Sequence, residues 1–172
     1  MPYQVNIETI VSLVAVAVAI LAVYFSNKNT RQQIRTEKLE RLYQSIQNLS
    51  RYYGLFMGCW ACILQLRNRD DKEIQTLEQY YQIRDQKITT IERRNIEELL
   101  SVISVLTDCY TKNELKKSLK EYEILMYSFF ELVVHGGSIQ QEIHFQNGYP
   151  DYDKFFEITE NLKIRIIAEI KL

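Results

Sequence analysis

One uninterrupted apolar run near the start of the chain constrains this sequence more than any other feature. From Ile10 to Phe25 the only polar side chains are Ser12 and the hydroxyl of Tyr24, and Ile7 extends the run to nearly the length that crosses a bilayer core. A soluble core helix is rarely this apolar on all sides. The run therefore predicts a single transmembrane helix, with residues 1–26 as the anchor and residues 27–172 as one further domain.

Charged residues around the run indicate its orientation. A cleavable signal peptide carries Lys or Arg before its apolar run, whereas residues 1–9 hold no basic residue and one acidic residue, Glu8. Basic residues follow the run instead, at Lys28, Arg31, Arg35, Lys38 and Arg41. Because cytoplasmic segments beside a membrane span are rich in Lys and Arg, we expect the N-terminus outside and residues 27–172 in the cytoplasm.

The composition favours an all-α domain after the anchor. The chain of 172 residues has only five Gly and two Pro, and strands need such turn residues more than helices do. Lys and Arg number 21 against 22 Asp and Glu, and this balance removes the main compositional argument for a nucleic-acid-binding protein. The three cysteines are an odd number in apolar helical stretches, which fits a reducing compartment.

Apolar periodicity predicts roughly five helices. No Gly or Pro occurs between Pro2 and Gly54, so we expect the anchor to continue directly into a cytoplasmic helix. That helix carries a stripe of apolar residues at helical spacing: Leu42, Ile46, Leu49, Tyr53 and Phe56. Further helices are expected over Leu55–Leu66, Lys72–Cys109, Thr111–His135 and the segment after Pro150.

Short capping patterns set some of these helix ends. Thr111 followed by Glu114 has the spacing of a capping box, and the Gly pair at 136–137 is typical of a helix stop. Asp151 or Asp153 can cap the final helix. The domain is thus expected to be a helical bundle with short connections.

Small residues recur along the anchor at alternating spacings of three and four, which places them on one helical face: Ser12, Ala15, Ala19, Ala22 and Ser26. In lipid, such residues permit the close backbone approach through which helices associate. The alternative is that Ala and Val are simply acceptable lipid-facing residues. The first interpretation predicts contact between copies of the chain.

A basic collar, defined as Lys28, Arg31, Arg35 and Lys38, lies on one face of the expected helix after the anchor. This face is continuous with the apolar stripe, and its character changes from basic to apolar at Leu42. The collar is expected either to contact lipid headgroups or, in an assembled ring, to line a positively charged vestibule.

No residue pattern predicts catalysis, a metal site or a cofactor. Cys59 and Cys62 have the CxxC spacing, but a zinc site would also need Cys109 with His135 or His144, which are scattered over the chain. A phosphate-binding glycine loop and a HExxH motif are both absent from the sequence. The 12 tyrosines are better explained as core edges or subunit contacts than as nucleobase platforms, because no ladder of basic residues accompanies them.

The N-terminal span, the basic residues from Lys28 to Arg41 and the Tyr-rich helical domain together resemble the small membrane accessory protein of type VI-B CRISPR systems. This resemblance covers the whole chain and is architectural. It implies a fold related to HEPN ribonucleases and a closed homo-oligomeric ring in the bacterial inner membrane. It also implies that this ring disturbs the membrane when a partner RNA-guided ribonuclease detects phage RNA. The HEPN signature places an Arg four to six residues before a His, and neither His135 nor His144 has one, so no ribonuclease residue is carried over.

The expected function is a non-enzymatic antiviral effector that oligomerises and makes the inner membrane leaky. Two alternatives stay open. One is a membrane-tethered HEPN-like ribonuclease, which predicts RNA degradation that depends on His135 or His144. The other is a passive adaptor that recruits a soluble partner, which predicts binding without a change in membrane potential.

Overall fold

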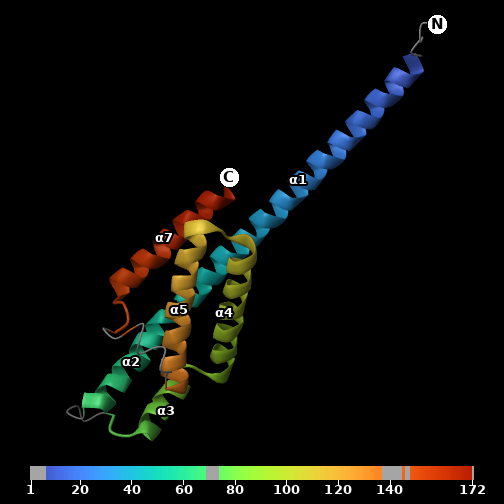
Figure 1. Ribbon diagram of the computed structural model, residues 1–172. Helices are drawn as coiled ribbons and strands as arrows, with labels where there is room; N and C mark the ends of the chain where they lie inside the picture. Colours follow the sequence, from blue (N-terminus) through green and yellow to red (C-terminus); the bar gives the residue numbers. More distant parts are fainter. Residues whose placement is uncertain (1–6, 69–73, 137–144, 146–147, 172) are drawn as a thin grey trace. The chain divides into compact units, whose positions relative to one another are not determined.

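The computed structural model describes residues 7–68, 74–136, 145 and 148–171, and all regular structure in these ranges is α-helical (Figure 1). The helices are α1 (Ile7–Ser50), α2 (Tyr53–Asn68), α3 (Leu77–Lys87), α4 (Thr90–Tyr110), α5 (Asn113–His135) and α7 (Tyr152–Ile170). The all-α prediction is confirmed. The chain forms two compact units, which meet between Glu37 and Lys38, inside the residue range of α1.

The second unit has its own apolar core. The predicted stripe of α1 and α2 is fully buried in it: Leu42, Ile46, Leu49, Tyr53 and Phe56. Leu39, which the sequence pattern did not include, is buried one turn earlier. Aromatic rings from α2, α5 and α7 meet at the centre, where Tyr53 stacks on Phe155 with ring centroids 3.6 Å apart and meets Phe129 edge-on at 5.3 Å.

Side-chain contacts fix the direction of α5 within this unit. The Tyr122 hydroxyl lies beside Ile46 and Ser50, and Phe129, two turns later, packs on Phe56. Helix α5 therefore runs parallel to the chain from α1 to α2. Helix α5 lies between α4 and α7, and both of these run in the opposite direction (Figure 1).

The predicted helix over Lys72–Cys109 is wrong, because two helices occupy its described part. Helix α4 starts afresh after Thr89, whose hydroxyl accepts a hydrogen bond from the Glu92 amide at 3.3 Å while the Glu92 carboxylate accepts one from the Thr89 amide at 2.7 Å. This capping box satisfies amides that a new helix start leaves unpaired. The described residues consequently hold six helices, one more than the periodicity predicted.

The predicted capping box at Thr111 is also wrong. The Thr111 hydroxyl donates backward to the Thr107 carbonyl at 2.7 Å, and the cap position of α5 falls on Lys112, which makes no side-chain capping bond. At the other end of α5, Gly136 adopts a left-handed conformation (φ 86°) and its amide bonds to carbonyls of the last turn, as predicted. Gly137 lies outside the described residues.

Asp151 caps the final helix, as one of the two predicted alternatives stated. Its carboxylate accepts a hydrogen bond from the Lys154 amide at 2.9 Å, whereas Asp153 lies inside the first turn. The carbonyl of the preceding Pro150 accepts a 2.5 Å hydrogen bond from the Tyr53 hydroxyl, which ties the start of α7 to α2.

Candidate membrane anchor and basic collar

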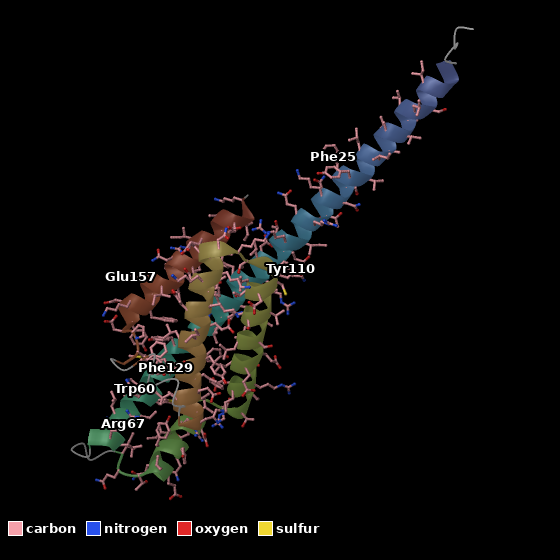
Figure 2. The ribbon with its side chains drawn as sticks, in the orientation of Figure 1. Phe25, Trp60, Arg67, Tyr110, Phe129 and Glu157 are labelled. Atoms are coloured by element: carbon pink, nitrogen blue, oxygen red, sulfur yellow. The ribbon has the colours of Figure 1, made fainter. Side chains whose placement is uncertain are left out.

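The apolar part of α1 is exposed along its whole described length. Every side chain from Ile10 to Phe25 is exposed, including Leu13 at 65% and Ile20 at 64%. Figure 2 shows Phe25, 54% exposed, projecting from this helix. By its length and composition, helix α1 is long and apolar enough to cross a membrane, and this much of the predicted anchor is confirmed. Sixteen apolar-rich positions rise by about 24 Å in a helix.

The small-residue face lies on this exposed stretch. Ser12, Ala15, Ala19, Ala22 and Ser26 are all helical and exposed, and on a regular helix they share an arc of about 80°. The Ser26 carbonyl accepts a 2.9 Å hydrogen bond from the Thr30 hydroxyl, so a polar side chain of the next turn is folded back onto the helix backbone. The face presents a shallow surface against which a second helix can pack closely.

The structure places the four collar residues on α1, at two levels of exposure. Lys28 and Arg31 are exposed, whereas Arg35 is half-buried. Lys38, also half-buried, is the first residue of the second unit. Arg41, the last of the five basic residues after the span, is exposed again. Exposed lysine and arginine side chains directly after an apolar span can reach the phosphate layer with their charged ends.

Burial makes the CxxC pair chemically inert. Cys59 is completely buried, and this burial raises the pKa of its thiol to about 11, so the reactive thiolate is scarce at neutral pH. The Cys62 thiol donates to the Gly58 carbonyl within the same helix at 3.2 Å. Cys109, in contrast, is exposed. In the described part of the chain, no three His, Cys, Asp or Glu side chains come together in a way that suits a metal ion.

His135 offers no catalytic arrangement. It is the exposed last residue of α5, and its ring meets Phe130 edge-on at a centroid distance of 6.2 Å. A positively charged imidazole is favourable at this end of a helix. His144, the other histidine, lies outside the described residues.

Three of the tyrosines are core residues with fixed hydroxyl partners. Tyr80 donates to the Val133 carbonyl at 2.5 Å, Tyr53 to Pro150, and Tyr122 to Ile46. Burial raises the pKa of all three phenols above the ordinary value, which keeps them neutral. These rings cannot stack on a nucleobase without opening the core, whereas Tyr81 and Tyr127 are exposed.

A cavity of about 640 Å³ opens on the surface of the second unit. It lies between α2, α3 and the end of α5, with apolar walls that include Ile63, Leu66 and Leu132. Arg67, whose guanidinium lies 5.7 Å from the ring centre of Trp60, stands at its edge. Among its described lining residues there is no carboxylate, histidine or cysteine, so the wall offers no acid–base pair.

Sequence reasoning missed an ion-pair network that joins α3, α4 and α5. Asp85 accepts from Arg84 at 2.8 Å and also pairs with Arg93, while Arg84 donates to the Val134 carbonyl at 2.8 Å. The hydrogen bond from Arg84 and the charge of Arg93 hold the pKa of Asp85 below its ordinary value. The Arg-Asp neighbours in the sequence were the available signal, but the partners on α4 and α5 depend on the tertiary fold.

Comparison with known proteins identifies no relative of this chain. No family model matches it, and neither a curated protein nor a solved structure is significantly similar to it. The functional argument therefore depends on the geometry of the anchor and of the second unit.

Proposed function

We propose that this chain is a membrane effector that self-assembles through its anchor and makes a bacterial inner membrane leaky. The observation that carries the proposal is the exposed apolar stretch from Ile10 to Phe25. A contiguous apolar surface of this size needs lipid or other copies of the chain to cover it. The small-residue face supports contact between copies, and the collar directly after it supports a charged mouth for a closed ring.

The mass of the solubilised assembly tests self-association. The full chain is extracted in a mild detergent, and light scattering with correction for detergent gives the number of chains per particle. A closed oligomer of defined mass is expected, because heterologous contacts that close produce rings of fixed size. A monomer at all concentrations removes the ring, and with it the vestibule.

The antiviral role and the coupling to an RNA-guided ribonuclease are part of the proposal through the resemblance to the type VI-B CRISPR accessory protein alone. A HEPN-like bundle is likewise proposed for the second unit, and its all-helical content is the supporting observation. Because no Arg precedes His135 at the required spacing, we expect no RNA cleavage. Degradation of RNA by the purified protein, abolished by His135→Ala, would instead favour the tethered ribonuclease.

The proposed orientation places the second unit in the cytoplasm. Five basic residues follow the span, and segments with this excess remain on the cytoplasmic side. A reporter fused after Leu172 is expected to be active only if it functions in the cytoplasm. Activity of a reporter that functions only in the periplasm would reverse the orientation.

A further inference from the structure

The second unit has a strong charge polarity along two of its helices. Residues 112–120 of the α5 region contain four lysines and one glutamate, whereas residues 121–135 contain three glutamates and neither lysine nor arginine. In α7 the order is reversed: residues 151–160 hold four acidic residues and one lysine, and residues 161–171 hold three basic residues and one glutamate.

The fold brings the two basic halves to the same end of the unit. Helices α5 and α7 run in opposite directions, and Arg165 of α7 donates to the Ser118 hydroxyl of α5 at 2.9 Å. This proximal end, where residues 38 and 39 begin the unit, carries the α4–α5 turn and the end of α7. Figure 2 marks it with Tyr110, and Arg67 lies at the opposite, distal end.

Helix stability does not explain the charge distribution in α5. A helix prefers acidic residues in its first turn and basic residues in its last turn, because of its macrodipole. Glu114 in the first turn of α5 and His135 in its last turn follow this preference, but Lys116, Lys117 and Lys120 near its start and Glu131 near its end do not. The absence of a side-chain cap at Lys112 leaves additional partial positive charge at the same place.

Three lysines at the proximal end are available for an external anion. Two other lysines are already paired, because the Asp108 carboxylate lies 2.9 Å from the Lys116 ammonium and 3.0 Å from the Lys120 ammonium. The exposed Lys112, Lys117 and Lys171 make no ion pair with any part of the chain that the structure describes. Among the described residues of the α4–α5 turn, Glu114 is the exposed carboxylate that forms no ion pair with a lysine. One such carboxylate does not balance these three lysines, so the proximal end retains an excess of positive charge.

We propose that Lys112, Lys117 and Lys171 form a docking surface for anionic lipid headgroups at the proximal end of the second unit. The inference rests on the membrane anchoring in the proposed function. Twelve residues lie between Phe25 and Lys38, and the thirteen steps from one to the other rise by about 20 Å in a helix. The headgroup layer spans about 5–8 Å of this distance. The length of a lysine side chain, together with the Debye length of about 10 Å at 0.1 M salt, covers the remainder, so a lysine at the proximal end still interacts with the anionic surface.

The native Cys109 provides a reporter for this surface. It is exposed and lies three residues before Lys112, while Cys59 and Cys62 are buried and resist labelling. The full chain, labelled at Cys109 with a donor dye, is placed in lipid nanodiscs at one chain per disc. Energy transfer to acceptor-labelled headgroups then measures how close the α4–α5 turn lies to the bilayer.

Transfer is expected to be greater in discs with one third phosphatidylglycerol than in phosphatidylcholine discs, and to lose the excess in 1 M salt. Replacing Lys112, Lys117 and Lys171 together by Gln should abolish the excess, because each lysine contributes up to about a fivefold factor to the surface association constant. Replacing the same three residues by Arg should preserve it. The matched control removes three exposed charges at distal positions, through Lys87→Gln, Arg94→Gln and Lys154→Gln, and should leave the excess unchanged.

Equal transfer in the two kinds of disc would overturn the proposal, as would an undiminished excess in the proximal Gln variant. Loss of the excess on addition of equimolar single-stranded RNA would show that these lysines bind RNA phosphates instead. Because each disc holds one chain, the result does not depend on oligomerisation or leakage, so failure of this inference and failure of the proposed function are distinguishable.

Discussion

The hydroxyl groups of Tyr122 and Ser50 lie 2.8 Å apart, and this contact joins α5 to the last turn of α1. Tyr122 also donates toward the Ile46 carbonyl at 3.3 Å, so one buried phenol satisfies polar groups at two positions of α1. Within the second unit the pair fixes the last turns of α1 against α5, where Leu49 and Ile46 are buried. Burial, and not the contact with Ser50, raises the pKa of the Tyr122 phenol, and this makes the stability of the unit sensitive to pH.

Stability of the second unit is expected to fall above about pH 10. Burial raises the pKa of Tyr122, Tyr53 and Tyr80, so the unfolded chain loses these protons first and the folded state is favoured less as pH rises. Each phenol adds a slope of about 1.4 kcal/mol per pH unit above its ordinary pKa near 10. Urea unfolding from pH 8 to 11 measures the slope. Tyr122→Phe should lower stability at pH 8 by about 1–2 kcal/mol and remove one phenol's contribution to the slope; an unchanged slope would contradict the assignment.

Replacing Thr89 with Ala should destabilise the second unit by about 1 kcal/mol, since the Thr89 hydroxyl caps the start of α4. The neighbouring Thr90→Ala is the matched control, because Thr90 is exposed and lies inside the helix. Chemical unfolding followed by circular dichroism compares the two. A loss of equal size in both variants would show that the cap does not set the break between α3 and α4.

Ala15→Leu combined with Ala19→Leu should weaken self-association, because bulky side chains prevent close approach of two anchor helices. The control is Val14→Leu combined with Val18→Leu, which adds bulk to other faces of the same exposed stretch. Sedimentation in detergent gives the size of each assembly. If both pairs of substitutions have the same effect, the small-residue face is not an interface.

Collar residues are expected to set the charge selectivity of leakage. In a closed ring, Lys28, Arg31, Arg35 and Lys38 would repeat around the symmetry axis and favour anions. Arg31→Glu with Arg35→Glu should reverse the anion preference of reconstituted liposomes, provided that orientation and assembly size are preserved. If the collar contacts headgroups alone, the same change weakens membrane attraction by about 1 kcal/mol per residue and leaves selectivity unaltered.

Local pattern predicted much of the fold, and tertiary contacts supplied the rest. The stripe from Leu42 to Phe56 was predictable because burial on one helical face imposes its own period. The break at Thr89 was missed because Ile88 and Ile96 stay in phase across it and no Gly or Pro marks it. Both Thr89 and Thr111 precede a Glu by three residues, and the fold uses only the first as a capping box.

The candidate anchor and collar are continuous in sequence, so their residues could be predicted directly. The lysine surface could not be predicted, because Lys112 and Lys171 are far apart in the chain and come to the same end of the unit only through the opposite directions of α5 and α7. The same limit applies to Asp85, whose partner Arg93 belongs to the next helix.

Leakage from liposomes tests the central claim most directly. The purified full chain is reconstituted in vesicles of bacterial lipid loaded with a small fluorescent anion, and release is recorded with and without the RNA-guided ribonuclease activated by its target RNA. The account predicts release that rises with chains per vesicle and is lost in the Ala15→Leu, Ala19→Leu variant. Correctly inserted, full-size assemblies that release nothing under either condition would contradict it.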